Sequence, residues 1–220
     1  MIIKTLAAGI FAICIAGGGV AAPLGGDQTY DMLFRNGTLD DINRDEALVY
    51  RRVVENALNP EFAARDTGDI ALSFREGQAT MAMLEFQQDG KHRVLGTFPA
   101  SVGNPMIMYF YEAVVRDMAE SAGGSPFYIR NRVKEALIQP SDVEVGEARF
   151  DGRVIKTQTI RLYPFEGDKN QDRMKGFGDL ELRVTMSDEV PGWYLSLVAE
   201  AAGGDLFRSE LLFDHLEDAQ

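Results

Sequence analysis

The chain has 220 residues, and its 34 acidic residues outnumber its 22 basic residues, which gives a net charge of −12. Such a surface repels phosphate backbones, and no basic stripe offsets it, so nucleic acid is excluded as a partner. The length suits one domain, because β-rich single domains commonly reach about 200–250 residues.

The first residues predict a cleaved secretion signal. Lys4 supplies a positive charge, an apolar run extends from Leu6 to Ala16, and small residues follow at Val20-Ala21-Ala22. This order is typical of a secretory signal, and the run is too short to span a bilayer, which requires about 20 residues. We expect cleavage after Ala21, which makes 1–21 the signal peptide and 22–220 a single α+β domain without a transmembrane span.

The position of the only cysteine indicates the compartment. Cys14 lies inside the expected signal, so the mature chain can form no disulfide and no thiolate metal site. The residues before Cys14 lack the small side chain expected next to a lipidated cysteine, so lipidation is a less favoured alternative. An exported protein without cysteine is ordinary in the bacterial periplasm but unusual among secreted eukaryotic domains, and we therefore expect a periplasmic protein.

The first part of the mature chain predicts a meander of strands. Asp89-Gly90 separates the strand-like segments Ala79–Gln87 and Lys91–Phe98, which indicates a hairpin. Asn36-Gly37 gives the same two-residue turn signal after Tyr30–Phe34, and we expect a strand there as well.

The pattern becomes helical after residue 103. Asn104 is a good N-cap and Pro105 suits the first helical position, and apolar residues then recur at helical spacing from Ile107 to Met118. Ser125-Pro126 repeats this signal for a second helix, which Pro140 ends. Two helices joined by so short a link should pack as an antiparallel hairpin.

Strands resume beyond the helices. Asp151-Gly152 marks another hairpin, Leu180–Met186 alternates strictly between apolar and polar residues, and Pro191-Gly192 turns into a further strand. Consecutive strands joined by tight turns must pair antiparallel. The sequence therefore predicts an α+β fold, an antiparallel sheet of about ten strands, curved or half-barrel in shape, with an inserted two-helix hairpin.

Residues suited to catalysis are scarce. His92 and His215 are the only histidines, and zinc sites usually take three or four nitrogen or sulfur ligands from the protein. Asp214 precedes His215, but adjacent strand residues point to opposite faces, and no G-x-S-x-G motif is present. We expect no catalytic residue and no cofactor.

One acidic loop is a weak candidate for a metal site. Asp168, Asn170 and Asp172 match positions 1, 3 and 5 of a calcium-binding loop, and Asp179 falls at position 12. Calcium prefers such oxygen ligands. Because Arg173 stands where the sharp turn needs glycine, we predict weak calcium binding or none.

The helical hairpin is the most distinctive candidate for a binding site. The run from Met106 to Tyr111 is apolar or aromatic throughout, so the helix needs cover on more than one side. Core packing explains such a run, and a bound apolar ligand between helices and sheet is the second interpretation. Arg130 and Lys134 share a helix face that would suit either an anionic head group or solvent. The candidate ligand-binding residues are therefore Met106, Met108, Tyr109, Tyr111, Arg130 and Lys134.

Three classes of function remain open. We favour a periplasmic binding or carrier protein for an apolar or amphipathic ligand. An envelope protein that binds a protein partner through an apolar patch is the alternative, and an enzyme is the least favoured class. The expected plan is similar to that of periplasmic lipoprotein and lipid carriers, a likeness of fold alone that implies no activity.

Overall fold

The computed structural model describes residues 19–20, 23–75, 77 and 79–219. Most of the expected signal peptide, including Cys14 and the cleavage site, therefore lies outside the described residues. The strands are β1 (Gly19–Val20), β2 (Glu46–Asn56), β3 (Gly68–Arg75), β4 (Met81–Gln88), β5 (Lys91–Pro99), β6 (Val143–Phe150), β7 (Arg153–Leu162), β8 (Glu181–Met186), β9 (Tyr194–Ala201) and β10 (Phe207–Asp218). The α-helices are α1 (Gly26–Leu33), α2 (Pro60–Asp66), α3 (Met106–Ala122) and α4 (Pro126–Leu137).

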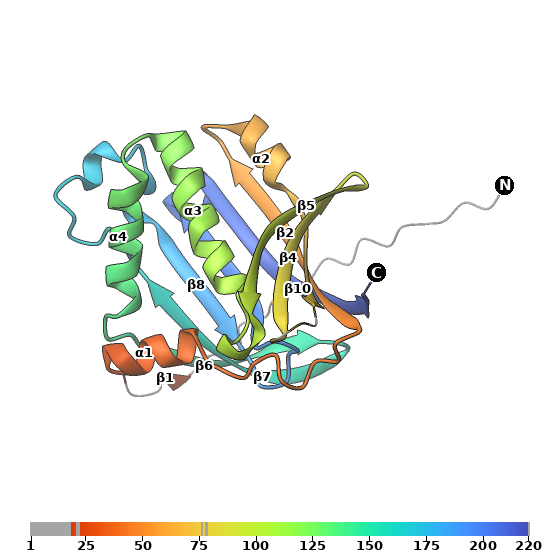
Figure 1. Ribbon diagram of the computed structural model, residues 1–220. Coiled ribbons are helices and arrows are strands. Elements are labelled where there is room, and N and C mark those ends of the chain that lie inside the picture. The colour runs from red at the N-terminus through yellow and green to blue at the C-terminus, as the bar shows by residue number, and fades with distance from the viewer. Residues whose placement is uncertain (1–18, 21–22, 76, 78, 220) are drawn as a thin grey trace.

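All ten strands belong to one open antiparallel sheet. Their order is β1-β6-β7-β8-β9-β10-β2-β3-β4-β5. The last strand, β10, pairs with both β9 and β2 and so joins the two meanders that flank the helical hairpin. The sheet is strongly curved, and α3 and α4 lie against its hollow face (Figure 1). The predicted α+β fold and its inserted helix pair are confirmed.

The predicted two-residue hairpin turns have the expected backbone. Asp89 and Gly90 have φ angles of 52° and 71°, and Asp151 and Gly152 have φ angles of 48° and 75°. Two consecutive positive φ angles are what a type I′ turn requires, and this turn matches the twist of the strands that it joins. Local chemistry alone was sufficient to predict these turns.

The strand predicted at Tyr30–Phe34 is wrong, because helix α1 covers most of that segment. Asn36-Gly37 accordingly lies in a loop and not in a hairpin. The helix packs close to the end of α4: a Cβ atom on Gly26 would lie 2.0 Å from the Ile138 carbonyl oxygen. This contact with the end of α4 outweighs the local turn preference of Asn36-Gly37, and the residues around 30–37 do not indicate that the contact exists.

Alternate residues of each central strand face the helices. On β8, Leu182, Val184 and Met186 are fully buried in the core, whereas Arg183 and Thr185 point to the opposite face. The sheet therefore has one face covered by helices and one face that the helices leave open.

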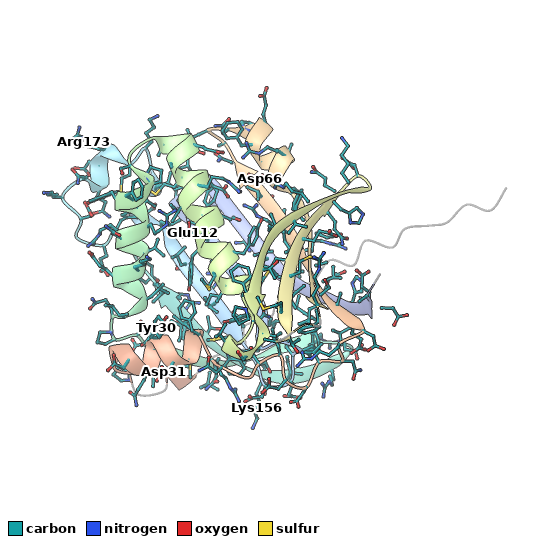
Figure 2. The ribbon with its side chains drawn as sticks, in the orientation of Figure 1. Tyr30, Asp31, Asp66, Glu112, Lys156 and Arg173 are labelled. Carbon is teal, nitrogen blue, oxygen red and sulfur yellow. The ribbon has the colours of Figure 1, made fainter. Side chains whose placement is uncertain are left out.

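A buried ion pair fastens α3 to the sheet. The side chain of Arg52, on β2, is 1% exposed, and its guanidinium donates to Asp117 of α3 at 2.7 Å and to the Tyr109 hydroxyl at 3.0 Å. Arg116 bridges Asp117 and Asp66, each at 3.1 Å, and Asp66 lies near the end of α2 (Figure 2). Burial raises the pKa of Asp117, and the charges of Arg52 and Arg116 oppose this effect. The network thus links β2, α2 and α3.

A second polar cluster fixes the start of α3. The Asn104 side chain accepts the Met106 N–H at 3.0 Å and donates to the Gly192 carbonyl at 2.9 Å and to the Tyr50 hydroxyl at 3.1 Å. The Tyr50 hydroxyl donates in turn to the Tyr194 carbonyl at 3.2 Å. The N-cap residue of α3 is Pro105, one position later than predicted, but Asn104 still accepts the N–H of the first helical residue, and the same side chain holds the loop before β9.

Gly192→Ala should destabilise the protein more than Gly203→Ala. Both glycines have positive φ, 75° and 65°, so each alanine is strained by about 1–2 kcal/mol. A Cβ on Gly192 would also lie 2.4 Å from Leu48 and 2.8 Å from the Asn104 amide, whereas one on Gly203 meets nothing within 4 Å. Overpacking should add about 1–3 kcal/mol at Gly192 only. Urea unfolding measures both losses, and equal losses would contradict this packing.

Asp117→Asn should cost far more stability than Glu112→Gln, although both residues lie on α3. The first change leaves Arg52 buried without a counter-ion, at a cost of about 3–5 kcal/mol. The second breaks an exposed pair with Arg130, which is worth about 1 kcal/mol or less. Urea unfolding at pH 7 measures both. The double variant Arg52→Met/Asp117→Leu should recover most of the loss, and failure to do so would contradict the role of the unpaired charge.

Candidate functional site

A groove of about 490 Å³ lies on the open face of the sheet. Residues of five adjacent strands, β6 to β10, line it. Its apolar lining includes Val145, Ala148, Leu195 and Val198. Its hydroxyl groups come from Thr157, Thr159, Thr185 and Ser196.

A β-bulge contributes to the shape of the groove. The pairing of β8 with β9 shifts between Thr185 and Met186, which leaves Leu195 as the extra residue of β9. A bulge bends its strand and increases the local twist. Leu195 thereby reaches the groove, although its neighbour Tyr194 has its ring in the core on the helical side.

An alternating row of charged side chains crosses this face from β6 to β10. Its members, in order, are Glu144, Arg161, Glu181, Arg183, Glu200, Arg208 and Glu210. Arg161 is ion-paired with Glu144 and lies 3.4 Å from Glu181. The next contacts, Arg183–Glu181 and Arg183–Glu200, measure 2.6 and 3.4 Å. Arg208 completes the row at 2.5 Å from Glu200 and 3.2 Å from Glu210. Each arginine is thus shared by two glutamates.

Strand register explains why the row runs diagonally. Arg161 lies directly opposite Arg183, and Glu181 directly opposite Glu200. Like charges directly opposite each other are destabilising, so these side chains lean toward diagonal partners of opposite sign. The row has one more carboxylate than guanidinium groups and is therefore slightly acidic.

The central glutamates of the row are partly shielded from solvent, although they do not line the groove itself. The side chains of Glu181 and Glu200 are only 19% and 20% exposed, whereas Glu144, at the β6 end, is 42% exposed. Aliphatic stems of arginine cover apolar surface while the charged ends stay in contact with water. The site can therefore contact an apolar group at the exposed Val145 and a polar group through hydroxyls and charges.

The candidate residues of the helical hairpin do not meet in one cavity. Met106 and Tyr111 are buried in the core, and burial raises the pKa of the Tyr111 hydroxyl. Tyr109 is bonded to Arg52, and Met108 is 48% exposed on the outer side of α3. The Met106–Tyr111 run is thus divided between core, ion network and surface.

The basic pair on α4 has an anionic partner within the chain. Arg130 donates two hydrogen bonds, each of 2.7 Å, to Glu112, which lies on α3 and is labelled in Figure 2. These bonds, together with the charge of the exposed Lys134, lower the pKa of Glu112. An external head group would have to compete with that carboxylate.

The acidic loop uses its first residue to bind α4. Asp168 accepts the Tyr128 hydroxyl at 2.5 Å and the Asn170 N–H at 2.8 Å, and these bonds lower its pKa; Arg132 lies 3.0 Å away. Asp179 instead accepts the Ala202 N–H at 3.0 Å. Within the described ranges, no group of three or more His, Cys, Asp or Glu residues is placed to hold a metal, and Asp172 joins no such group.

The histidines pair with neighbouring carboxylates at the surface. His92 Nδ1 lies 2.9 Å from Glu85, and His215 Nδ1 lies 2.9 Å from Asp214. The expectation that Asp214 and His215 point apart is wrong. A register shift between Phe213 and His215 interrupts the alternation that separates adjacent strand residues.

The charged row is the feature that reasoning from the sequence missed. A signal was available, since Glu181 and Arg183, and Arg208 and Glu210, occupy alternate positions of predicted strands. Such pairs are common on solvent faces, and only the strand order shows that they form one continuous row.

No model of a known protein family matches the sequence, and no curated protein matches it. Among the residues that the structure describes, no helix is long and apolar enough to cross a membrane.

Calcium should not stabilise the protein. Asp168 is already bonded to Tyr128 and Asn170 and paired with Arg132, so binding would have to break these contacts. A bound ion would add about 2.7 kcal/mol of stability at a hundredfold excess over Kd. Thermal melts in millimolar calcium and in chelator should coincide. An upward shift with calcium that is lost in Asp168→Ala would contradict this prediction.

Proposed function

We propose that the protein is an exported, periplasmic binding protein that holds an amphipathic ligand in the open-face groove. The observation that carries this proposal is the groove itself, in which an apolar strip lies beside hydroxyl groups and a charged row. Ligand sites combine apolar walls with a few placed polar groups in this way. The leader-like segment before residue 22 supports export.

The charge of the row indicates the polar end of the ligand. Three arginines are shared among four glutamates, so no guanidinium group is left without a counter-ion in the row. An anionic head group would have to displace a glutamate, whereas a cationic or hydrogen-bond-donating head group would complete the pairing of Glu144 or Glu210. The negative net charge of the protein likewise favours a positively charged ligand.

The groove is a better candidate than the space beneath the helical hairpin. Met106 and Tyr111 already occupy that space with their own side chains, and Arg130 is bound to Glu112. A ligand there would have to displace core packing, which costs more than occupying an existing groove.

Thr185→Trp should weaken ligand binding by about tenfold, because an indole would fill the groove where Thr185 faces Thr159 at 3.1 Å. The measurement is fluorescence titration with a dansyl-labelled alkylamine, and a dansyl-labelled fatty acid tests the sign of the head group. Val94→Trp is the matched control, since Val94 is exposed on β5 at the other end of the sheet.

Two further arms of the same titration test the location of the site. Met108→Ala should leave the affinity unchanged, and a loss there would favour the helical hairpin as the binding site. Equal affinity of wild-type protein and Thr185→Trp, or absence of saturable binding to either probe, would refute the groove. Native mass spectrometry of protein from its own cells would identify the ligand.

A further inference from the structure

The short strand β1 covers the first residues of one edge of the sheet. Gly19 and Val20 pair antiparallel with Val145 and Glu144 of β6. A few residues later, Leu24 is bridged to Ser141 by two backbone hydrogen bonds of 3.0 and 3.2 Å. The start of the chain is thus attached beside β6 at two successive places.

Signal cleavage would separate these two attachments. The expected site, after Ala21, lies between the segment that pairs with β6 and the residue that bridges to Ser141. Processing would remove β1 and leave the Leu24 bridge in the mature protein. The backbone groups of Glu144 and Val145 that pair with β1 would then lose their partners. This step depends on the proposed export but not on the proposed ligand.

The two edges of the sheet differ in how they are protected. Edge β5 carries Lys91 and Arg93, ends at Pro99, and has a register shift opposite Leu84 and Glu85. Charged residues, proline and bulges are the usual means of keeping an edge from pairing with another chain. Strand β6 also carries charged residues, Glu144, Glu147 and Arg149, but it has no proline, and its register with β7 is unbroken from end to end. Once β1 is removed, β6 is the edge that is suited to accept a strand.

We propose that removal of the leader opens the β6 edge for an extended segment of a partner protein, which adds there as an antiparallel strand in place of residues 19–20. Main-chain hydrogen bonds supply the affinity in such strand addition, and alternate side chains supply the specificity. In the described part of the chain, Glu144 is ion-paired only with Arg161, on the β7 side. A lysine or arginine of the partner, placed opposite Glu144, continues the alternating charged row by one strand.

The test compares the processed protein, which begins at Ala22, with the full-length precursor. The probe is a labelled synthetic peptide of alternating threonine and valine with one central lysine, and binding is followed by fluorescence anisotropy. The processed protein should bind it saturably, and the precursor about tenfold more weakly because β1 occupies the edge. Equal binding by the two forms would overturn the proposal, as would an exported protein that retains Met1.

Two peptide controls separate strand addition from other binding. A copy of the peptide in which every second backbone nitrogen is methylated should not bind, because it lacks the N–H groups that would donate hydrogen bonds to β6. A copy with glutamate in place of lysine should bind about fivefold more weakly, because like charges oppose each other across strands. Glu144→Gln should abolish that preference without loss of melting temperature, since the residue is half exposed. Equal binding of the N-methylated peptide would overturn the proposal.

The remaining competitor for the edge is a second copy of the chain. Sedimentation of the processed protein should show a monomer that binds one peptide. A dimer that excludes the peptide would assign the edge to self-association and overturn the proposal. The amphiphile titration is independent of these outcomes, because Thr185→Trp should affect the alkylamine and leave peptide binding at the backbone edge intact.

Discussion

The arrangement of this protein depends on the buried ion pair between Arg52 and Asp117. A guanidinium group in the core is tolerable only when a carboxylate accompanies it, and Asp117 of α3 is that carboxylate, which Arg116 links to Asp66 of α2. The pair therefore restricts the position of α3 on the sheet, because Asp117 must lie over Arg52 of β2. Asn104 fixes the other end of the helix through Tyr50 and Gly192, so α3 is held at both ends by polar contacts.

Because α3 and α4 are committed to the hollow face, the function that we propose falls on the other side of the sheet. In the apolar run that suggested a ligand under the helices, Met106, Ile107, Phe110 and Tyr111 are buried in the core. On the open face, the strands present charged and hydroxyl side chains at every second position. Curvature and the bulge at Leu195 gather these side chains into a groove instead of spreading them over a flat surface.

Features set by interactions between neighbouring residues could be predicted from the sequence, whereas features set by contacts between distant segments could not. Asp89-Gly90 and Asp151-Gly152 were predictable because backbone strain at two adjacent residues selects the turn. The segment at Tyr30–Phe34 was not, because its helical state depends on contact with the end of α4, more than a hundred residues away. The bulge that brings Asp214 to His215 was equally unpredictable, because it arises from the pairing of β10 with β2, a strand far away in the sequence.

The sequence by itself determined the α+β class, the antiparallel pairing and the position of the helical hairpin. These features follow from turn chemistry, capping and periodicity, each of which acts over a few residues. Only the tertiary structure decided that β10 joins the two meanders, that Arg52 meets Asp117, and that separate strand charges form one row from Glu144 to Glu210. Strand order and diagonal pairing depend on distances between segments far apart in the chain, and no local pattern of residues encodes those distances.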